Sequence, residues 1–306
     1  MYLQLEDIAG SFGTTVDNFN DSFIALYEST NWSYTKLEGA DKDKKIIDCL
    51  EFVKQDKQII ASPIRTTEWE SGWKENLDRY KISNNIEDII PRFIRSNRPV
   101  RYKKEFIIPK DPSFELNYIK LIQRWFFSTY MHSYSSIHEF GCGSGMHLVT
   151  LSNLFPNKKL FGYDFSPSSV DLVNTLSRTT ATNITGILFD MCNPSNVTHI
   201  DENACCFTFG SIEQLAGKFH NFLDFIMQKK PGICFHIEPT IELYDPTNLV
   251  DYTAICFHNN RGFTVGFLPY LQELDKQNII KLIKVNRLQF GNLHMEGYTQ
   301  IMWSPI

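Results

Sequence analysis

The sequence lacks several features that would assign it to a familiar class of protein. No apolar run approaches the ~20 residues that a membrane-spanning helix needs, and the amino-terminal MYLQLEDIAG lacks the basic-then-apolar pattern of a secretory signal. The seven cysteines form no CxxC pair and no Cys/His cluster with zinc-like spacing. The net charge of -5 lacks the basic excess that nucleic-acid-binding proteins usually carry. We therefore expect a soluble, cytoplasmic protein that binds no metal and whose partner is not nucleic acid.

The 306 residues divide into two parts with different patterns. Up to about residue 112 the chain is polar, aromatic-rich and irregular, with helices expected over 41–60 and 67–81, the second N-capped by Thr67. A further helix is expected from about Phe114. From about residue 136, short apolar runs alternate with amphipathic segments, which predicts a parallel sheet covered by helices on both faces. Two final strand-like runs, joined by a short turn around Gly291, imply one antiparallel strand. We expect two domains, residues 1–112 and 113–306, the first forming a mainly helical cap.

The stretch IHEFGCGSGMHLVTLSNLFPNKKLFGYDFS, residues 137–166, carries the strongest functional signal. Its three glycines directly follow an expected buried strand, where they would present bare amides and let a ligand approach the backbone closely. Asp164 ends the next expected strand, about 20 residues on, where such folds place an acid that binds ribose hydroxyls. The stretch therefore predicts a nucleoside site. A dinucleotide fingerprint would need a glycine at Met146, and Glu139 suits a cationic ligand better than a pyrophosphate.

The run from Glu139 to Gly145 has the form acid-x-Gly-x-Gly-x-Gly, and so resembles the first motif of the class I S-adenosylmethionine-dependent methyltransferases. The resemblance covers roughly residues 115–306 and implies a seven-stranded, mostly parallel, doubly wound α/β sheet with S-adenosylmethionine as cofactor. It also implies that Asp164 holds the ribose, that Asp190 accepts from the adenine amino group, and that the 208–211 segment lies under the methionine part. The implied cofactor-binding residues are Glu139, Gly141, Cys142, Gly143, Gly145, Asp164, Phe165, Ser166, Phe189, Asp190, Met191, Phe209 and Gly210.

One feature departs from the family pattern, and another narrows the class of methyl acceptor. Glu213-Gln214 stands where many members that act on small molecules have Glu-His. No Asn/Asp-Pro-Pro-aromatic tetrapeptide follows the fourth strand, which disfavours methylation of nucleobase amino groups. Individual residues of these motifs also have purely structural explanations: Asp164 could cap a helix, and Phe189 and Met191 could be core residues.

The acceptor side is less sharply defined. In GICFHIEPTIELYD, His236 and Glu238 project to one side of a strand end, so that His236 could act as a general base with its pKa raised by Glu238. A hydrogen-bonded structural histidine is the alternative. The candidate substrate-binding residues are Trp69, Trp73, Tyr244 and Arg261, each of which could equally be a packing or surface residue.

The basic and aromatic stretch RFIRSNRPVRYKKEF, residues 92–106, could hold phosphates and rings, or be a solvated linker. Taken together, the residues predict a methyltransferase acting on an oxygen or nitrogen of a small or carbohydrate-like polar acceptor. The alternatives are an RNA or protein methyltransferase, or a non-catalytic module that binds S-adenosylmethionine.

Overall fold

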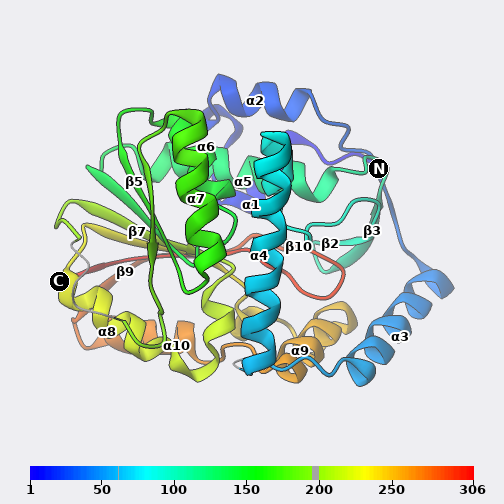
Figure 1. The fold of residues 1–306 in the computed structure, drawn as a ribbon. Helices are drawn as coiled ribbons and strands as arrows, with labels where there is room; N and C mark the ends of the chain where they lie inside the picture. The colour runs from blue at the N-terminus through cyan, green and yellow to red at the C-terminus, as the bar shows by residue number, and fades with distance from the viewer. Residues whose placement is uncertain (61, 195–199) are drawn as a thin grey trace.

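A seven-stranded sheet forms the centre of the computed structural model, which describes residues 1–60, 62–194 and 200–306 (Figure 1). The strand order is β6-β5-β4-β7-β8-β11-β9. The strands β4 to β8 pair in parallel, whereas β11 runs antiparallel to both of its neighbours. The strands are β4 Ser136–Phe140, β5 Lys159–Asp164, β6 Ile184–Leu188, β7 Ala204–Phe209, β8 Ile233–Glu238, β9 Ile280–Arg287 and β11 Thr299–Pro305. The predicted α/β class with a mostly parallel sheet is confirmed.

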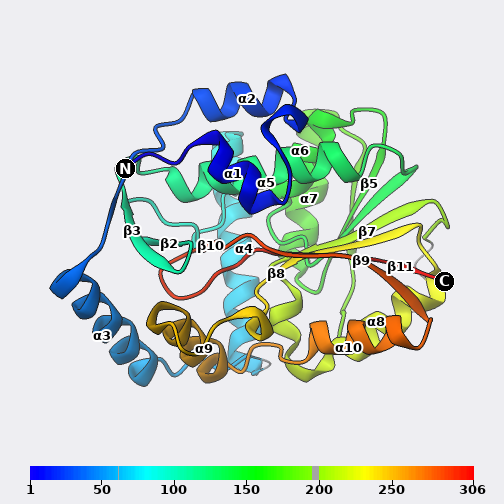
Figure 2. The same ribbon diagram turned by 180° about the vertical axis from the view of Figure 1, so that it is seen from behind.

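Helices cover both faces of this sheet, as Figures 1 and 2 show from opposite sides. One face packs against α5 Phe114–Tyr130, α6 Met146–Leu154 and α7 Pro167–Thr180, and the other against α8 Phe219–Lys229 and α10 Phe267–Lys276. Because both faces are covered, every residue of β4 and of β8 is buried. In the described part of the chain, no helix has the length and apolar character that crossing a membrane requires.

The amino-terminal third is less purely helical than expected. Its helices are α1 Leu5–Phe12, α2 Asp21–Glu28, α3 Gly39–Gln55 and α4 Pro63–Ser83, with short 3-10 turns at Val16–Asn18 and Ile86–Ile89. Between them it contributes the short strands β1 Tyr34–Lys36, β2 Val100–Tyr102 and β3 Glu105–Pro109. The prediction that Thr67 caps the second helix is wrong. The helix α4 begins at Pro63, four residues before Thr67, and Ser62 caps it by accepting from the backbone N–H of Arg65. Pro63 at the first helical position fits this start.

A second, four-stranded sheet joins the amino-terminal third of the chain to the segment between β9 and β11. Its order is β1-β3-β2-β10, and β10 (Phe290–Gly291) comes from the segment between β9 and β11. The expected short turn around Gly291 is therefore wrong: the chain leaves the main sheet after Arg287, pairs Phe290 with Tyr102, and returns at Thr299. Residues from both sides of the expected 112/113 boundary build this sheet, so the boundary does not separate two independent sheets.

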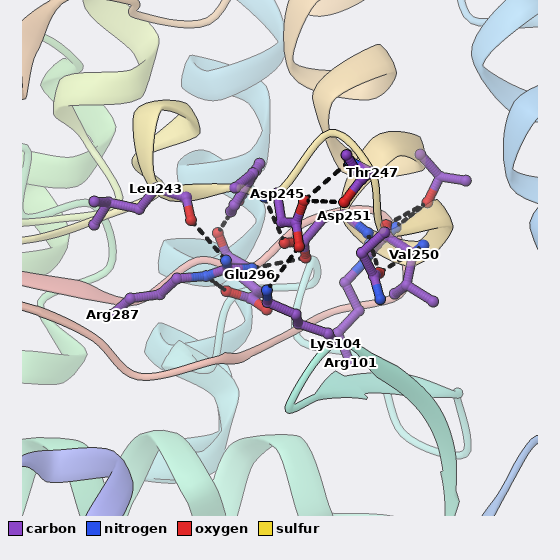
Figure 3. A network of polar contacts seen from close by, with 12 residues as sticks. Arg101, Lys104, Leu243, Asp245, Thr247, Val250, Asp251, Arg287 and Glu296 are labelled. Atoms are coloured by element: carbon purple, nitrogen blue, oxygen red, sulfur yellow. Dashed lines mark hydrogen bonds and ion pairs between the residues drawn. The ribbon is translucent and has the colours of Figure 1, made fainter.

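A buried polar network reinforces the same junction (Figure 3). The guanidinium of Arg101, on β2, is fully buried and donates to the backbone carbonyls of Leu293 and Val250 and to Thr253 Oγ1. Its neighbour Arg287, on β9, contacts carboxylates at 2.6–2.7 Å, one on Glu296 and one on Asp251 of α9 (Leu249–Arg261). Buried guanidinium groups need such partners, because an unpaired charge in the interior is costly.

The remaining short elements are two 3-10 segments, η3 at Ile212–Lys218 and η4 at Ile241–Leu243. The segment η3 follows β7, and η4 follows β8, so both lie beyond the carboxyl edge of the main sheet. This is the edge where open α/β folds bind their ligands.

Candidate functional site

The loop between β4 and α6 has the conformation that its glycines predict. Gly141, Gly143 and Gly145 have φ values of 75°, 52° and 76°, in the left-handed region that residues with a side chain rarely adopt. At Gly141 a Cβ would also lie 2.4 Å from Cβ of Ser211, a distance that no real pair of such atoms shows. The backbone of the loop therefore lies against Ser211, which follows β7, and only glycine fits at position 141.

The backbone amides of this loop are not bare, contrary to expectation. Gly141 and Cys142 donate to the carbonyl of Tyr163, Gly143 donates to Oδ2 of Asp164, and Gly145 donates to the carbonyl of Cys142. These bonds hold the loop in a fixed shape. What the glycines offer a ligand is thus close approach to the backbone rather than hydrogen-bond donors.

Asp164 ends β5 and lies directly beside the loop. Its carboxylate accepts at 2.9 Å from the N–H of Gly143 and at 2.9 Å from that of Ser166. Burial raises the pKa of Asp164 to about 6, although these two N–H groups favour the charged form. Each carboxylate oxygen has a second lone-pair direction, so the group keeps capacity to accept from further donors. Phe165, the next residue, is 39% exposed.

Glu139 is fully buried at the end of β4. Its Oε1 accepts from Nδ1 of His147 at 2.6 Å, whereas Oε2 has no hydrogen-bond partner within the described ranges. Burial raises the pKa of Glu139, and the contact with His147 opposes that rise. A buried oxygen without a partner is unfavourable, so it is a natural acceptor for a cationic or N–H-bearing ligand.

The other predicted cofactor residues lie around the same edge in different settings. Phe189 is buried in the core against Phe140 and Phe225, whereas Met191 reaches Gly141 with its terminal methyl. Asp190 is exposed, and its two oxygens accept from the N–H of Cys192 and from the side chain of Asn193. Cys142 points into the core, and Gly210 is exposed after β7, where Phe209 packs on His147.

The proposed role of His236 as a general base is contradicted. The ring is buried among Phe267 and Trp303, with Nε2 accepting from Nε1 of Trp303 at 2.9 Å and Nδ1 bonded to Oγ1 of Thr208 at 2.8 Å. No ring nitrogen remains to take a proton. The expected rise of its pKa is also wrong, because burial lowers the pKa to about 3. His236 is a neutral, structural histidine.

Glu238 shares a side of β8 with His236, as expected, but does not pair with it. Its two oxygens accept at 3.1 Å from the backbone N–H groups of Ser211 and Ile212. Burial raises the pKa of Glu238 to about 7 in spite of these bonds. Glu238 therefore fixes the start of η3 and does not act as a partner for an imidazole.

Glu213, in η3, is a buried carboxyl group, and in sequence it stands out only because Gln214 and not histidine follows it. Burial, followed by the charge of Glu238, raises the pKa of Glu213 to about 8. Within the described ranges its side chain accepts one hydrogen bond, from the neutral amide of Gln214 at 2.8 Å. Tyr298 packs edge to face against Phe209, and burial, followed by the charges of Glu115 and Glu213, raises the pKa of its hydroxyl. A carboxyl group with a pKa near neutral at a sheet's carboxyl edge is suited to accept a proton.

The two tryptophans Trp69 and Trp73 come from α4 and reach both halves of the site. Their rings stack at 5.4 Å. Nε1 of Trp69 donates to Oε1 of Gln214 at 3.3 Å, and the ring of Trp73 lies against Gly143. Neither is simple core packing, because each contacts a loop at the carboxyl edge.

The other two substrate candidates are engaged elsewhere. Tyr244 is buried, donates to the carbonyl of Glu296 at 2.9 Å, and packs under Arg287. Arg261 forms a close ion pair with Asp56, whose side chain is 5% exposed, so its charge is already compensated. The structure therefore contradicts Arg261 as a free anion-binding group.

Three residues that contact the site were missed from sequence: Glu70, His147 and Tyr298. His147 is the second residue of α6, directly after the glycine loop, and its place beside Glu139 could have been read from that spacing. Glu70 and Tyr298 reach the site only through the packing of α4 and of the segment before β11, which leaves no local pattern.

Comparison with known proteins identifies the fold. No protein-family model and no curated protein matches the chain. Among solved structures, a geranyl diphosphate methyltransferase in complex with GPP and sinefungin aligns with a TM-score of 0.51, 12% identity, and coverage of 80% of this chain and 100% of its own.

The (4+2)-cyclase SpnF aligns with a TM-score of 0.51 and 10% identity, over 77% of this chain and 94% of its own. With the strand order above, these likenesses show that the chain has the fold of the class I S-adenosylmethionine-dependent methyltransferases, as its motifs imply. Because one neighbour is named a methyltransferase and the other a cyclase, the reaction has to be argued from the site.

Proposed function

We propose that the protein is an S-adenosylmethionine-dependent methyltransferase that acts on a small polar acceptor. The observation that carries this proposal is the buried Glu139, with an unpartnered oxygen, directly before a loop whose three glycines all have positive φ. A carboxylate in that position favours a ligand with a positive charge and disfavours a pyrophosphate. Asp164 stands on the far side of the loop at the distance along the chain that ribose binding requires.

The residues present fit this cofactor. Glu139 would hold the positively charged amino acid part, Asp164 the ribose hydroxyls, and Phe165 a face of the adenine ring. Asp190 and Met191 complete the proposed adenosine side, and Phe209 and Gly210 the methionine side. The cofactor, when bound, supplies a methyl group already activated on a sulfonium, so the protein has chiefly to position the acceptor and remove a proton.

Glu213 is the residue we assign to proton removal, in place of His236. It is buried, its hydrogen-bond partner among the described residues is the neutral Gln214, and its pKa is about 8, so near neutral pH it exchanges its proton readily. A base of this kind lets an acceptor hydroxyl or ammonium group lose its proton as it reacts. The neighbouring Gln214 fixes one oxygen of Glu213 and leaves the other available to the acceptor.

A small acceptor is favoured over RNA by the state of the basic stretch at residues 92–106. Four of its six basic side chains are engaged by the protein itself: Arg92 pairs with Glu75, Lys103 with Asp7, and Lys104 with Asp245, while Arg101 is buried. Arg95 and Arg98 are exposed, so the charge that this stretch offers a phosphate backbone is reduced to a part of what the sequence indicates.

Calorimetry with S-adenosylmethionine, S-adenosylhomocysteine and NAD tests the proposed cofactor. We expect the two sulfur-containing ligands to bind and to raise the melting temperature, because a ligand that binds only the folded state stabilises it. NAD should not bind, since Glu139 would repel its pyrophosphate. Binding of NAD alone, or of none of the three, would contradict the proposed function.

A further inference from the structure

Helix α4 lies across the candidate cofactor site and contacts it at three separate places. Trp73 stands against the glycine loop: a Cβ added to Gly143 would lie 2.7 Å from Cζ2 and 2.9 Å from Cη2 of its ring. The space that the absence of a side chain at Gly143 opens for a ligand is thus filled by an indole ring of the same chain.

Glu70, one turn before Trp73, closes the ribose side of the site. Its carboxylate accepts at 2.5 Å from Oγ of Ser166, at 2.5 Å from Oγ of Ser168, and at 3.3 Å from the N–H of Ser168. These donors form the first turn of α7, where the helix dipole also favours a negative charge. Ser166 is adjacent to Asp164 through a backbone hydrogen bond, so Glu70 lies beside the carboxylate proposed to hold the ribose.

Trp69 reaches the acceptor side by donating to Gln214, which in turn donates to Glu213. The amino-terminal half of α4 therefore spans from the proposed base to the ribose acid. Its carboxyl-terminal half is fixed differently: Leu77 and Tyr80 pack with Leu172 and Leu176 of α7, and the hydroxyl of Tyr80 bonds Oγ1 of Thr179 at 2.6 Å.

The two halves of α4 meet at Ser71-Gly72. A glycine inside a helix weakens it, and Gly/Ser pairs are among the recognised sites of helix bending. Packing does not require the glycine, because a Cβ at Gly72 would meet no atom within 4 Å. The pair separates the half that carries Trp69 and Glu70 from the half whose Leu77 and Tyr80 pack on α7, and Trp73 is the first residue after the pair.

We propose that the amino-terminal half of α4, residues 63–72, is an autoinhibitory lid, latched by Glu70 on the first turn of α7 and hinged at Ser71-Gly72, which must open before the cofactor binds. This inference rests on the proposed function, since it takes the covered cradle to be the cofactor site. In the closed form Glu70 occupies space beside Asp164. Trp73, the first residue after the hinge, lies against Gly143 and stacks at 5.4 Å on Trp69 of the lid. The measured affinity for the cofactor is then the intrinsic affinity reduced by the fraction of molecules that are open.

The test uses the full-length protein and three variants. Glu70→Ala removes the latch. Glu75→Ala is the matched control, because Glu75 lies on the same helix and, among the described residues, forms its ion pair with Arg92, away from α7. Gly72→Ala stiffens the hinge without a clash. Calorimetry with S-adenosylhomocysteine measures affinity, and hydrogen exchange without ligand measures opening of residues 63–72.

Glu70→Ala is expected to bind S-adenosylhomocysteine about tenfold more tightly than the wild type, because the closed form loses three hydrogen bonds to a charged group. Exchange in residues 63–72 should be faster in this variant and unchanged in Glu75→Ala. Gly72→Ala should weaken S-adenosylhomocysteine binding about fivefold, because the ~1 kcal/mol preference of a helix for alanine lowers the fraction of open molecules by that factor.

The outcomes separate the two proposals. Equal or weaker binding by Glu70→Ala, with the wild type binding, would show that Glu70 does not oppose the cofactor and would overturn the lid alone. Absence of binding by every variant would overturn the proposed function, and the lid with it. Unchanged exchange in Glu70→Ala would also overturn the latch, whatever the affinity.

Discussion

The two halves of the candidate site were built in different ways. The cofactor half takes its main groups from β4, β5 and the loops that follow each, within the stretch from Glu139 to Ser166. The acceptor half takes Glu213 and Gln214 from η3 and Trp69 from α4, which lie far apart in the sequence. A site made from neighbouring loops can be recognised by spacing. A site made by packing distant elements together cannot, because no local pattern records the contact.

The strongest test of this difference between the two halves is to remove Glu213, the group that we assign to acceptor chemistry. Glu213→Gln should lower kcat by about 10²–10⁴, the range that general bases contribute, and leave affinity for S-adenosylhomocysteine nearly unchanged. In the wild type, kcat/KM should rise with pH through the Glu213 pKa of about 8, because the base must lose its proton before it can accept one.

Glu115→Gln is the control for that experiment. Glu115 is another buried carboxyl group in the same region, with its pKa raised to about 7 by burial. Steady-state kinetics should show a much smaller loss of kcat for this variant. A similar loss in both variants would mean that the charge of the region matters and not the position of Glu213.

On the cofactor side, Asp164→Asn should weaken S-adenosylhomocysteine binding about 10–100-fold, because the amide makes weaker hydrogen bonds than a charged carboxylate. In the wild type, affinity should also fall as pH drops below about 6, where the buried carboxyl of Asp164 takes up a proton. Calorimetry at several pH values checks both. An affinity that stays constant from about pH 7.5 to about pH 5 would contradict the ribose assignment.

Phe165→Leu tests the exposed edge of the cofactor half. A leucine keeps an apolar side chain but loses the aromatic face, which is worth about 0.5–1.5 kcal/mol and corresponds to roughly two- to tenfold in affinity. The effect should appear in the dissociation constant and leave the melting temperature of the free protein unchanged, since Phe165 is 39% exposed. A large loss of stability would instead assign it to packing.

The smallest effect on activity is expected at His236. His236→Asn should keep kcat within about twofold and lower the free energy of unfolding by about 1–3 kcal/mol, because the hydrogen bonds to Thr208 and Trp303 are lost in the core. Urea unfolding and steady-state kinetics on the same preparation measure the two quantities. A large drop in kcat without loss of stability would restore the histidine to a catalytic role.

The sequence predicted the sheet and the loop because both depend on local rules. The alternation of strands and helices from residue 136 onwards corresponds to the main sheet, and the glycine spacing corresponds to the loop between β4 and α6. The sequence failed at His236, whose spacing to Glu238 correctly put both on one side of β8 but could not show that this side is the core face against α10.

Helix α4 illustrates the same limit. Its existence and its tryptophans could be predicted, but Glu70 gained a role only because α4 packs on α7. The route of the chain between β9 and β11 was likewise hidden: two strand-like runs with a turn indicate a hairpin, and nothing local shows that Phe290 pairs with Tyr102. Long-range pairing, not propensity, decided each of these cases.

That pairing of β10 with β2 has a consequence for how the protein is made. On the ribosome, β2 emerges long before β10, and at about 5–20 residues per second it waits on the order of ten seconds for its partner. Until then the aromatic residues around Phe12, Trp32 and Tyr118 lack the covering side chains of Leu288 and Phe290. During synthesis the newly made amino-terminal part therefore keeps apolar surface exposed, and such surface makes an incomplete chain prone to aggregate.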